Sequence, residues 1–126
     1  MSASIWLAIG SVLGAAGVAL GAFGAHGLRG RVGPDLVAVF ETAVRYHLTH
    51  ALAIVAVAWA SDRWPNPWSA AAGWLFVAGI AVFCGSLYLL VFTGARWLGA
   101  VTPIGGLALI AGWCALALAA LRSDSY

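Results

Sequence analysis

Three histidines are the residues of this sequence most able to do chemistry, and all lie within long apolar segments. His47 and His50 are three residues apart, and His26 precedes them at the end of the first apolar segment. Residues three apart share one side of a helix, so His47 and His50 face the same way. Ionisable residues are costly inside a bilayer and are often functional there. Counted from the segment ends, all three fall in one half of the membrane and form a candidate cluster.

Two interpretations of this cluster stay open. In the first, His26, His47 and His50 bind a haem, a metal or a small solute, or relay protons, because imidazole performs these roles in proteins. In the second, the histidines join helices by hydrogen bonding to hydroxyl or carbonyl groups of neighbours. We expect the second, because an HxxH pair is a weak ligand signature and a structural zinc site needs four ligands. We therefore expect no metal site and no cofactor.

The other polar residues of the apolar segments do not form a catalytic set. Ser86, Tyr88 and Thr102 lie in later segments, and hydrogen bonding between helices accounts for them. Only four acidic residues are present, and they lie far apart in the sequence. No carboxylate is therefore placed to orient a histidine beside a serine, as a nucleophilic triad requires. We expect no catalytic residue and no enzymatic activity by this chain alone.

Four apolar segments must position these residues, and each is near or above the ~17–25 residues that cross a bilayer. Hydrophobic residues make up 63% of the chain and charged residues 8%, whereas a soluble domain carries about 25% charged residues. Short linkers between the segments predict an up-down-up-down bundle. We predict an all-α, four-helix transmembrane bundle, a single integral membrane domain over 1–126, with helices at about 5–28, 36–60, 70–92 and 98–121.

The first of these segments carries a repeat of small residues, which we call the glycine seam. Its members are Gly10, Gly14, Gly17, Gly21 and Gly24. Their spacing alternates between four and three, which is the seven-residue repeat of a helix interface. Small residues let backbones approach closely in lipid, where the hydrophobic effect does not drive helices together. The fourth segment repeats the pattern at Gly105 and Gly112, so we expect both to be helix-packing positions.

These two glycine surfaces exceed what a four-helix monomer must use. We therefore expect a homo-oligomer or a larger membrane complex, in which this chain is an accessory, scaffold or structural subunit. The other expected partners are membrane lipids, in what we take to be a bacterial inner membrane. A formal net charge of +2 is too small to indicate nucleic-acid binding.

Several single residues carry predictions about local structure. Asp35 is a candidate N-cap of the second helix. Pro103 predicts a kink or a late start of the fourth helix. Cys84 and Cys114 are expected to be small core residues. Trp6 belongs to a group of tryptophans near one membrane face, where we expect an aromatic belt.

Four motifs, taken in order, resemble a known family. They are Gly21–Leu28 (GAFGAHGL), Tyr46–Leu52 (YHLTHAL), Gly85–Leu90 (GSLYLL), and Thr102–Gly106 (TPIGG) followed by Ala111–Trp113 (AGW). This order resembles the domain of unknown function 423 family, which includes small bacterial membrane proteins and the animal transmembrane protein 256. The resemblance covers nearly the whole chain and implies a small four-helix integral membrane protein, but no activity. The motif polar positions are His26, Tyr46, His50, Ser86, Tyr88 and Thr102.

Overall fold

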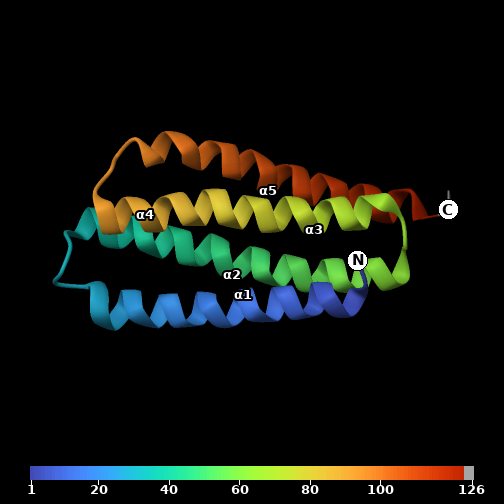
Figure 1. The fold of residues 1–126 in the computed structure, drawn as a ribbon, viewed down its shortest axis with the longest axis horizontal. Helices are drawn as coiled ribbons and strands as arrows, with labels where there is room; N and C mark the ends of the chain where they lie inside the picture. Colours follow the sequence, from blue (N-terminus) through green and yellow to red (C-terminus); the bar gives the residue numbers. More distant parts are fainter. Residues whose placement is uncertain (124–126) are drawn as a thin grey trace.

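Four long helical rods make up the structure, a computed structural model that describes residues 1–123 (Figure 1). Residues 124–126, the end of the domain expected from the sequence, lie outside the described residues. The elements are α1 (Ala3–Phe23), η1 (Gly24–Leu28), α2 (Pro34–Arg63), α3 (Pro67–Gly79), η2 (Ile80–Cys84), α4 (Gly85–Thr93) and α5 (Leu98–Leu121). Because η1 continues α1 and η2 joins α3 to α4, these elements form four rods, each long and apolar enough to cross a membrane. The predicted all-α four-helix bundle is confirmed.

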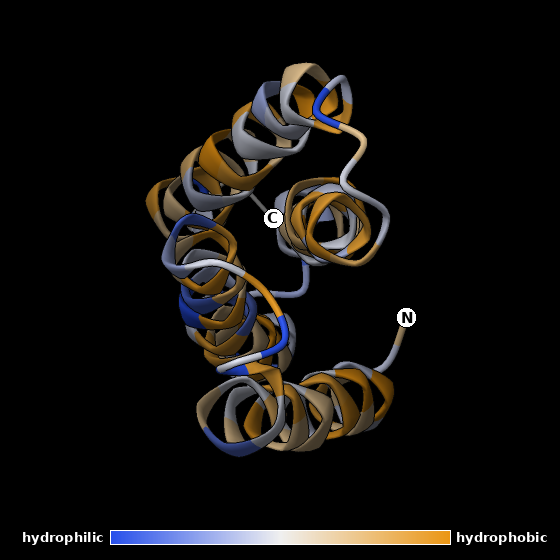
Figure 2. Cartoon of the chain, turned by 90° about the vertical axis from the view of Figure 1, so that its left-hand side faces the viewer, coloured by the Kyte–Doolittle hydropathy of each residue, from blue (hydrophilic) through white to orange (hydrophobic). Residues whose placement is uncertain are grey.

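The rods run antiparallel, with the first and last described residues and the α2–α3 turn at one end of the bundle (Figure 1). Helix α2 is central, because it packs against α1 on one side and against α3, η2 and α4 on the other. Helix α5 packs mainly against α3 and η2 and touches α2 little. The view along the rods shows α1 and α5 at opposite edges, so the bundle is open rather than square (Figure 2).

The ends of two helices differ from the prediction for identifiable reasons. Helix α2 begins at Pro34 with Gly33 as its N-cap, and Asp35 lies in the first turn. Proline suits this first position because its fixed φ matches the helix and its missing N–H needs no partner there. Helix α3 begins at Pro67, earlier than expected, because the side chain of Asn66 caps it by accepting a 3.0 Å hydrogen bond from the Trp68 backbone N–H. The prediction of Asp35 as an N-cap was wrong.

Two short π-helical segments interrupt the rods, and neither was predicted. Segment η1 ends the first rod, and η2 lies in the middle of the third. A π segment widens one turn and shifts the side chains that follow it around the axis. Helix α5, in contrast, begins at Leu98 and runs unbroken past Pro103, so the late start predicted from this proline was wrong.

The main core lies between α2, α3 and α5, and Trp6 of α1 joins it. Trp6 is fully buried rather than placed in an aromatic belt, because its ring occupies the space that the missing side chain of Gly73 leaves. Cys84 is also fully buried, whereas Cys114 is exposed, so only the first of the two predicted core cysteines lies in the core. The exposed apolar side chains elsewhere on α1 and α5 fit a protein whose solvent is lipid.

Candidate functional site

His47 is the centre of the polar contacts inside the bundle and joins three rods. It lies on α2 and is 5% exposed. Its Nε2 is 2.8 Å from the carbonyl oxygen of Leu13 on α1, and its Nδ1 is 2.9 Å from the hydroxyl of Tyr88 on α4. A carbonyl can only accept, so Nε2 carries the proton and donates it. In the neutral ring, Nδ1 then accepts from the Tyr88 hydroxyl.

His50 lies one turn further along α2 and joins it to α5. Its Nδ1 is 2.7 Å from the backbone carbonyl oxygen of Tyr46, to which it must donate. Its Nε2 accepts a 3.0 Å hydrogen bond from the indole N–H of Trp113. The ring also stacks on Tyr46, with ring centroids 6.0 Å apart. Trp113 thus packs between helices, although one side of it stays exposed.

These contacts leave the two buried histidines without a free lone pair. Each ring donates to a carbonyl through one nitrogen and accepts from a hydroxyl or an indole through the other. A metal ion or a haem iron binds the unprotonated nitrogen of a neutral imidazole. At His47 and His50 that nitrogen already holds a hydrogen-bond donor, so the geometry favours the joining of helices over the binding of a ligand.

His26 lies apart from this pair. It belongs to η1, where Gly24 and Leu28 face inward and the His26 side chain is exposed. The predicted cluster of three histidines therefore does not form, because the η1 turn directs His26 away from α2. No group of three or more histidine, cysteine or acidic side chains in residues 1–123 is arranged to hold a metal ion.

A second polar contact joins α4 to α5. The hydroxyl oxygens of Ser86 and Thr102 are 2.6 Å apart, and each hydroxyl also lies within hydrogen-bond distance of a backbone carbonyl of its own rod. Ser86 is buried, and Thr102 is partly buried. Hydroxyl groups that bond both to their own rod and across an interface stabilise helix pairs in lipid. Tyr46, the remaining motif residue, is partly exposed and packs its ring 4.5 Å from that of Phe83.

The glycine seam faces α2 along only part of its width. A side chain at Gly10, Gly17 or Gly24 would come within 3.0 Å of α2 atoms, from Val55, Leu48 and Phe40 respectively. At Gly21 the nearest atom, from Val44, is 3.2 Å away.

Gly14 is not packed closely against another helix in residues 1–123, although the repeat predicted that it would be. A Cβ atom there would meet nothing within 4 Å. Gly14 lies about 60° around the helix from Gly17, because three residues advance about 300°. Helix α2 crosses the row formed by Gly10, Gly17 and Gly24, so Gly14 is left at its edge.

The glycines of α5 contact the third rod more tightly. A Cβ atom at Gly105 would overlap the backbone of Phe83, and one at Gly112 would lie 2.7 Å from the ring of Phe76. Two further glycines of α3 do the same and were not predicted: Gly73 receives Trp6, and Gly79 receives Leu109. They are six residues apart, which matches no helix repeat, so the sequence offered no signal for them.

Comparisons with known proteins agree on one family. The family described as "Protein of unknown function (DUF423)" matches residues 20–106. The UPF0382 membrane protein YwdK of Bacillus subtilis is 42% identical over 119 residues, covering 94% of this chain and 97% of the relative. The UPF0382 membrane protein SH2409 of Staphylococcus haemolyticus is 38% identical over 124 residues, covering 94% and 96% respectively. No solved structure matches the chain.

Proposed function

The chain belongs to the DUF423 family and is a small multipass membrane protein, and from this premise we propose that it works as a structural or scaffold subunit. In this role it packs against copies of itself or against a larger membrane complex and has no catalytic activity of its own. The observation that carries the proposal is a groove beside Gly14 that no part of the described chain fills.

This groove runs along one side of the α1–α2 pair and has a volume of about 460 Å³. Its lining consists of Gly10, Ser11, Gly14, Val18, Leu48, Ala51, Leu52 and Val55. A glycine within a helix costs about 1 kcal/mol relative to alanine, which close packing normally offsets. Gly14 receives no such close packing from the part of the chain that the structure describes. A helix from outside the chain would supply it.

The histidines support the same proposal. His47 joins α2 to α1 and α4, and His50 joins α2 to α5, so both side chains hold rods in place. A protein that presents a packing surface needs its helices fixed in position. Both nitrogens of each ring are already hydrogen-bonded, so neither histidine has a nitrogen left to bind a ligand.

A transport or binding role for protons, a metal, a haem or a small solute is the alternative. One observation favours it: the His47 ring is hydrogen-bonded to the Tyr88 hydroxyl at membrane depth, and histidine is one of the residues that form proton relays in pumps and transporters. Proton flux into liposomes, measured with His47→Ala as the control, distinguishes this role. An absorption spectrum and a metal analysis of the purified protein test the cofactor version.

The proposed function is tested by filling the groove. We expect Gly14→Leu to fold normally, because its side chain enters empty space, and to lose the oligomer or the co-purifying partner seen with the wild type in mild detergent. Light scattering after size-exclusion chromatography measures the assembly. Ala16→Leu is the matched control, because Ala16 is exposed on the other flank of α1. An assembly that is unchanged by Gly14→Leu, or a wild type that is monomeric and partner-free, would contradict the proposal.

A further inference from the structure

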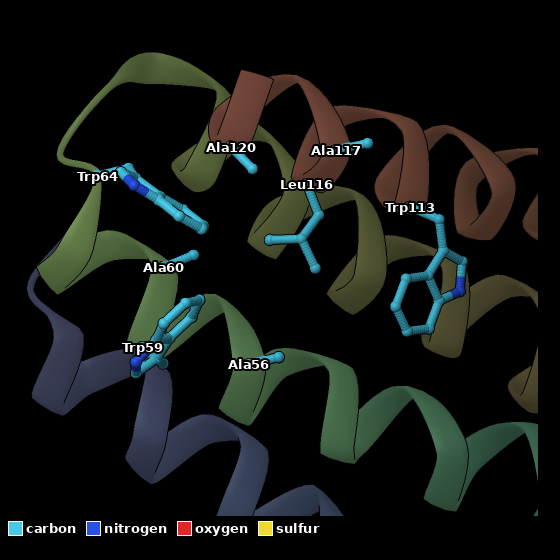
Figure 3. Close-up of a pocket in the computed structure, with 8 residues that line it drawn as sticks. All are labelled: Ala56, Trp59, Ala60, Trp64, Trp113, Leu116, Ala117 and Ala120. Carbon is cyan, nitrogen blue, oxygen red and sulfur yellow. The ribbon is translucent and has the colours of Figure 1, made fainter. Parts of the chain in front are cut away.

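A second groove lies between α2 and α5 and differs from the first in its position and its charges (Figure 3). Its volume is about 300 Å³. The lining residues are Ala56, Trp59, Ala60, Trp64, Trp113, Leu116, Ala117 and Ala120. The groove exists because α5 packs on α3 and barely touches α2, and because alanines form much of both walls.

The groove runs parallel to the helices, and Trp113 lies at its inner end. Trp64 and Ala120 lie close to the ends of their helices, and Trp113 lies deeper (Figure 3). Seven residues separate Trp113 from Ala120, which is about 10 Å along a helix. The hydrogen bond to His50 fixes the Trp113 ring at the inner end. Both walls belong to candidate membrane spans, so the groove opens to lipid.

The outer end of the groove carries positive charge. Arg63 directly precedes Trp64, and Arg122 follows Ala120 by two residues; both arginines are exposed. The ion pair found within residues 1–123 joins Arg29 to Glu41 at the opposite end of the bundle, so neither arginine is paired with a carboxylate of these residues. The Arg122 guanidinium lies 5.7 Å from the centroid of the Trp68 ring, which holds it at this end.

The nearest described carboxylate does not cancel this charge. Asp62 lines a different groove, where Ala3, Ser4 and Leu7 of α1 form the other wall. It therefore faces α1 and not α5. An arginine can bind a phosphate through two parallel hydrogen bonds, and basic residues beside a membrane attract anionic lipids.

We propose that the α2–α5 groove binds one acyl chain of an anionic phospholipid, with its phosphate between Arg63 and Arg122. The direction of the groove suits this occupant, because acyl chains also run parallel to membrane-spanning helices. The two exposed arginines at the outer end favour an anionic headgroup over a second copy of this chain, which itself carries a formal net charge of +2.

Native mass spectrometry of the full chain tests the proposal. The protein is equilibrated in mild detergent with equal amounts of phosphatidylglycerol and phosphatidylcholine that carry the same acyl chains. We expect the wild type to retain phosphatidylglycerol in preference by roughly fivefold or more, which corresponds to about 1 kcal/mol. Equal retention of the two lipids would overturn the proposal.

Two sets of variants separate the acyl-chain contact from the headgroup contact. Ala117→Leu fills the groove from an exposed position and should reduce the retention of both lipids, whereas Ala111→Leu, also exposed on α5, should not. Arg63→Gln with Arg122→Gln should remove the preference for phosphatidylglycerol, whereas Arg96→Gln at the opposite end should keep it.

Two results with these variants would overturn the lipid site. One is unchanged lipid retention by Ala117→Leu; a change of oligomer size in the same variant would then assign the groove to a second copy of the chain. The other is an unchanged preference for phosphatidylglycerol in the variant that combines Arg63→Gln with Arg122→Gln. Gly14→Leu should not alter lipid retention, so failure of the scaffold proposal and failure of this one are distinguishable.

Discussion

The α1–α2 and α3–α5 interfaces both depend on glycines but use them differently. On α5, Gly105 and Gly112 receive the backbone of Phe83 and the ring of Phe76, so each space left by a missing side chain is filled. On α1, Gly17 receives a leucine side chain, but Gly14 beside it receives nothing. The α3–α5 interface is thus complete within the chain. At the α1–α2 interface, the glycine surface at Gly14 remains uncovered. The glycine spacings of α1 and α5 are alike, so the sequence alone does not tell the complete interface from the incomplete one.

The largest effect should come from Gly105→Leu. The added side chain would meet the backbone of Phe83, which cannot turn aside as a side chain can. We expect destabilisation above the ~1–3 kcal/mol of ordinary overpacking, or failure to accumulate in the membrane. Thermal unfolding in detergent and the yield of membrane-inserted protein measure this. Wild-type stability would show that the α3–α5 interface is looser than its contacts indicate, and the comparison would fail.

Gly17→Leu should destabilise the protein less, by about 1–3 kcal/mol. A Cβ atom at Gly17 would lie 2.6 Å from the far end of the Leu48 side chain. That side chain can move to another rotamer. The same unfolding measurement ranks it against Gly105→Leu. Gly14→Leu, three residues away, is the matched control. It should be as stable as the wild type or more stable by up to about 1 kcal/mol, because its side chain enters open space and leucine favours a helix over glycine. If Gly14→Leu were instead more destabilising than Gly17→Leu, α2 would pack against Gly14 and not against the row of Gly10, Gly17 and Gly24.

Among the destabilising variants, the smallest effect should come from His50→Ala, at about 1 kcal/mol. Hydrogen bonds between helices in membranes contribute about 0.6 kcal/mol on average, and the lost ring contacts with Phe76 and Trp113 add to this. The variant also leaves the Trp113 indole N–H without its acceptor. Thermal unfolding measures the stability. The fluorescence of Trp113 is isolated by subtracting the spectrum of Trp113→Phe, and it is then compared with and without His50→Ala. An unchanged fluorescence signal would mean that the His50–Trp113 bond does not form in solution.

The sequence predicted the rods well because their signal is long and simple. Each apolar segment is bounded by charged residues, prolines or glycines, and each became one rod. Helix starts were predicted less well, because Asn66 and Pro67 form a cap that lies outside the apolar run. The two π segments left no pattern in the sequence, since each depends on one extra residue in a turn.

The candidate site was predicted in kind but not in detail. The cost of polar groups in lipid predicted hydrogen bonds to hydroxyl and carbonyl groups of other helices. His47 makes both, whereas His50 bonds to a carbonyl of its own helix and to the indole N–H of Trp113. Tyr88, Leu13 and Trp113 could not be named as the partners, because they come from three other rods whose rotation the sequence does not specify. The separation of His26 likewise depends on the η1 turn.

The position of the two chain ends has a practical consequence for experiments in cells. Because the chain has four candidate membrane spans, an even number, its first and last described residues lie on the same side of the membrane (Figure 1). Reporter enzymes fused to either terminus should therefore be active in the same compartment. The halves of a split fluorescent protein, one on each terminus of a single chain, should complement each other, whereas a half inserted at Gly94 in the α4–α5 connection should stay dark with either of them.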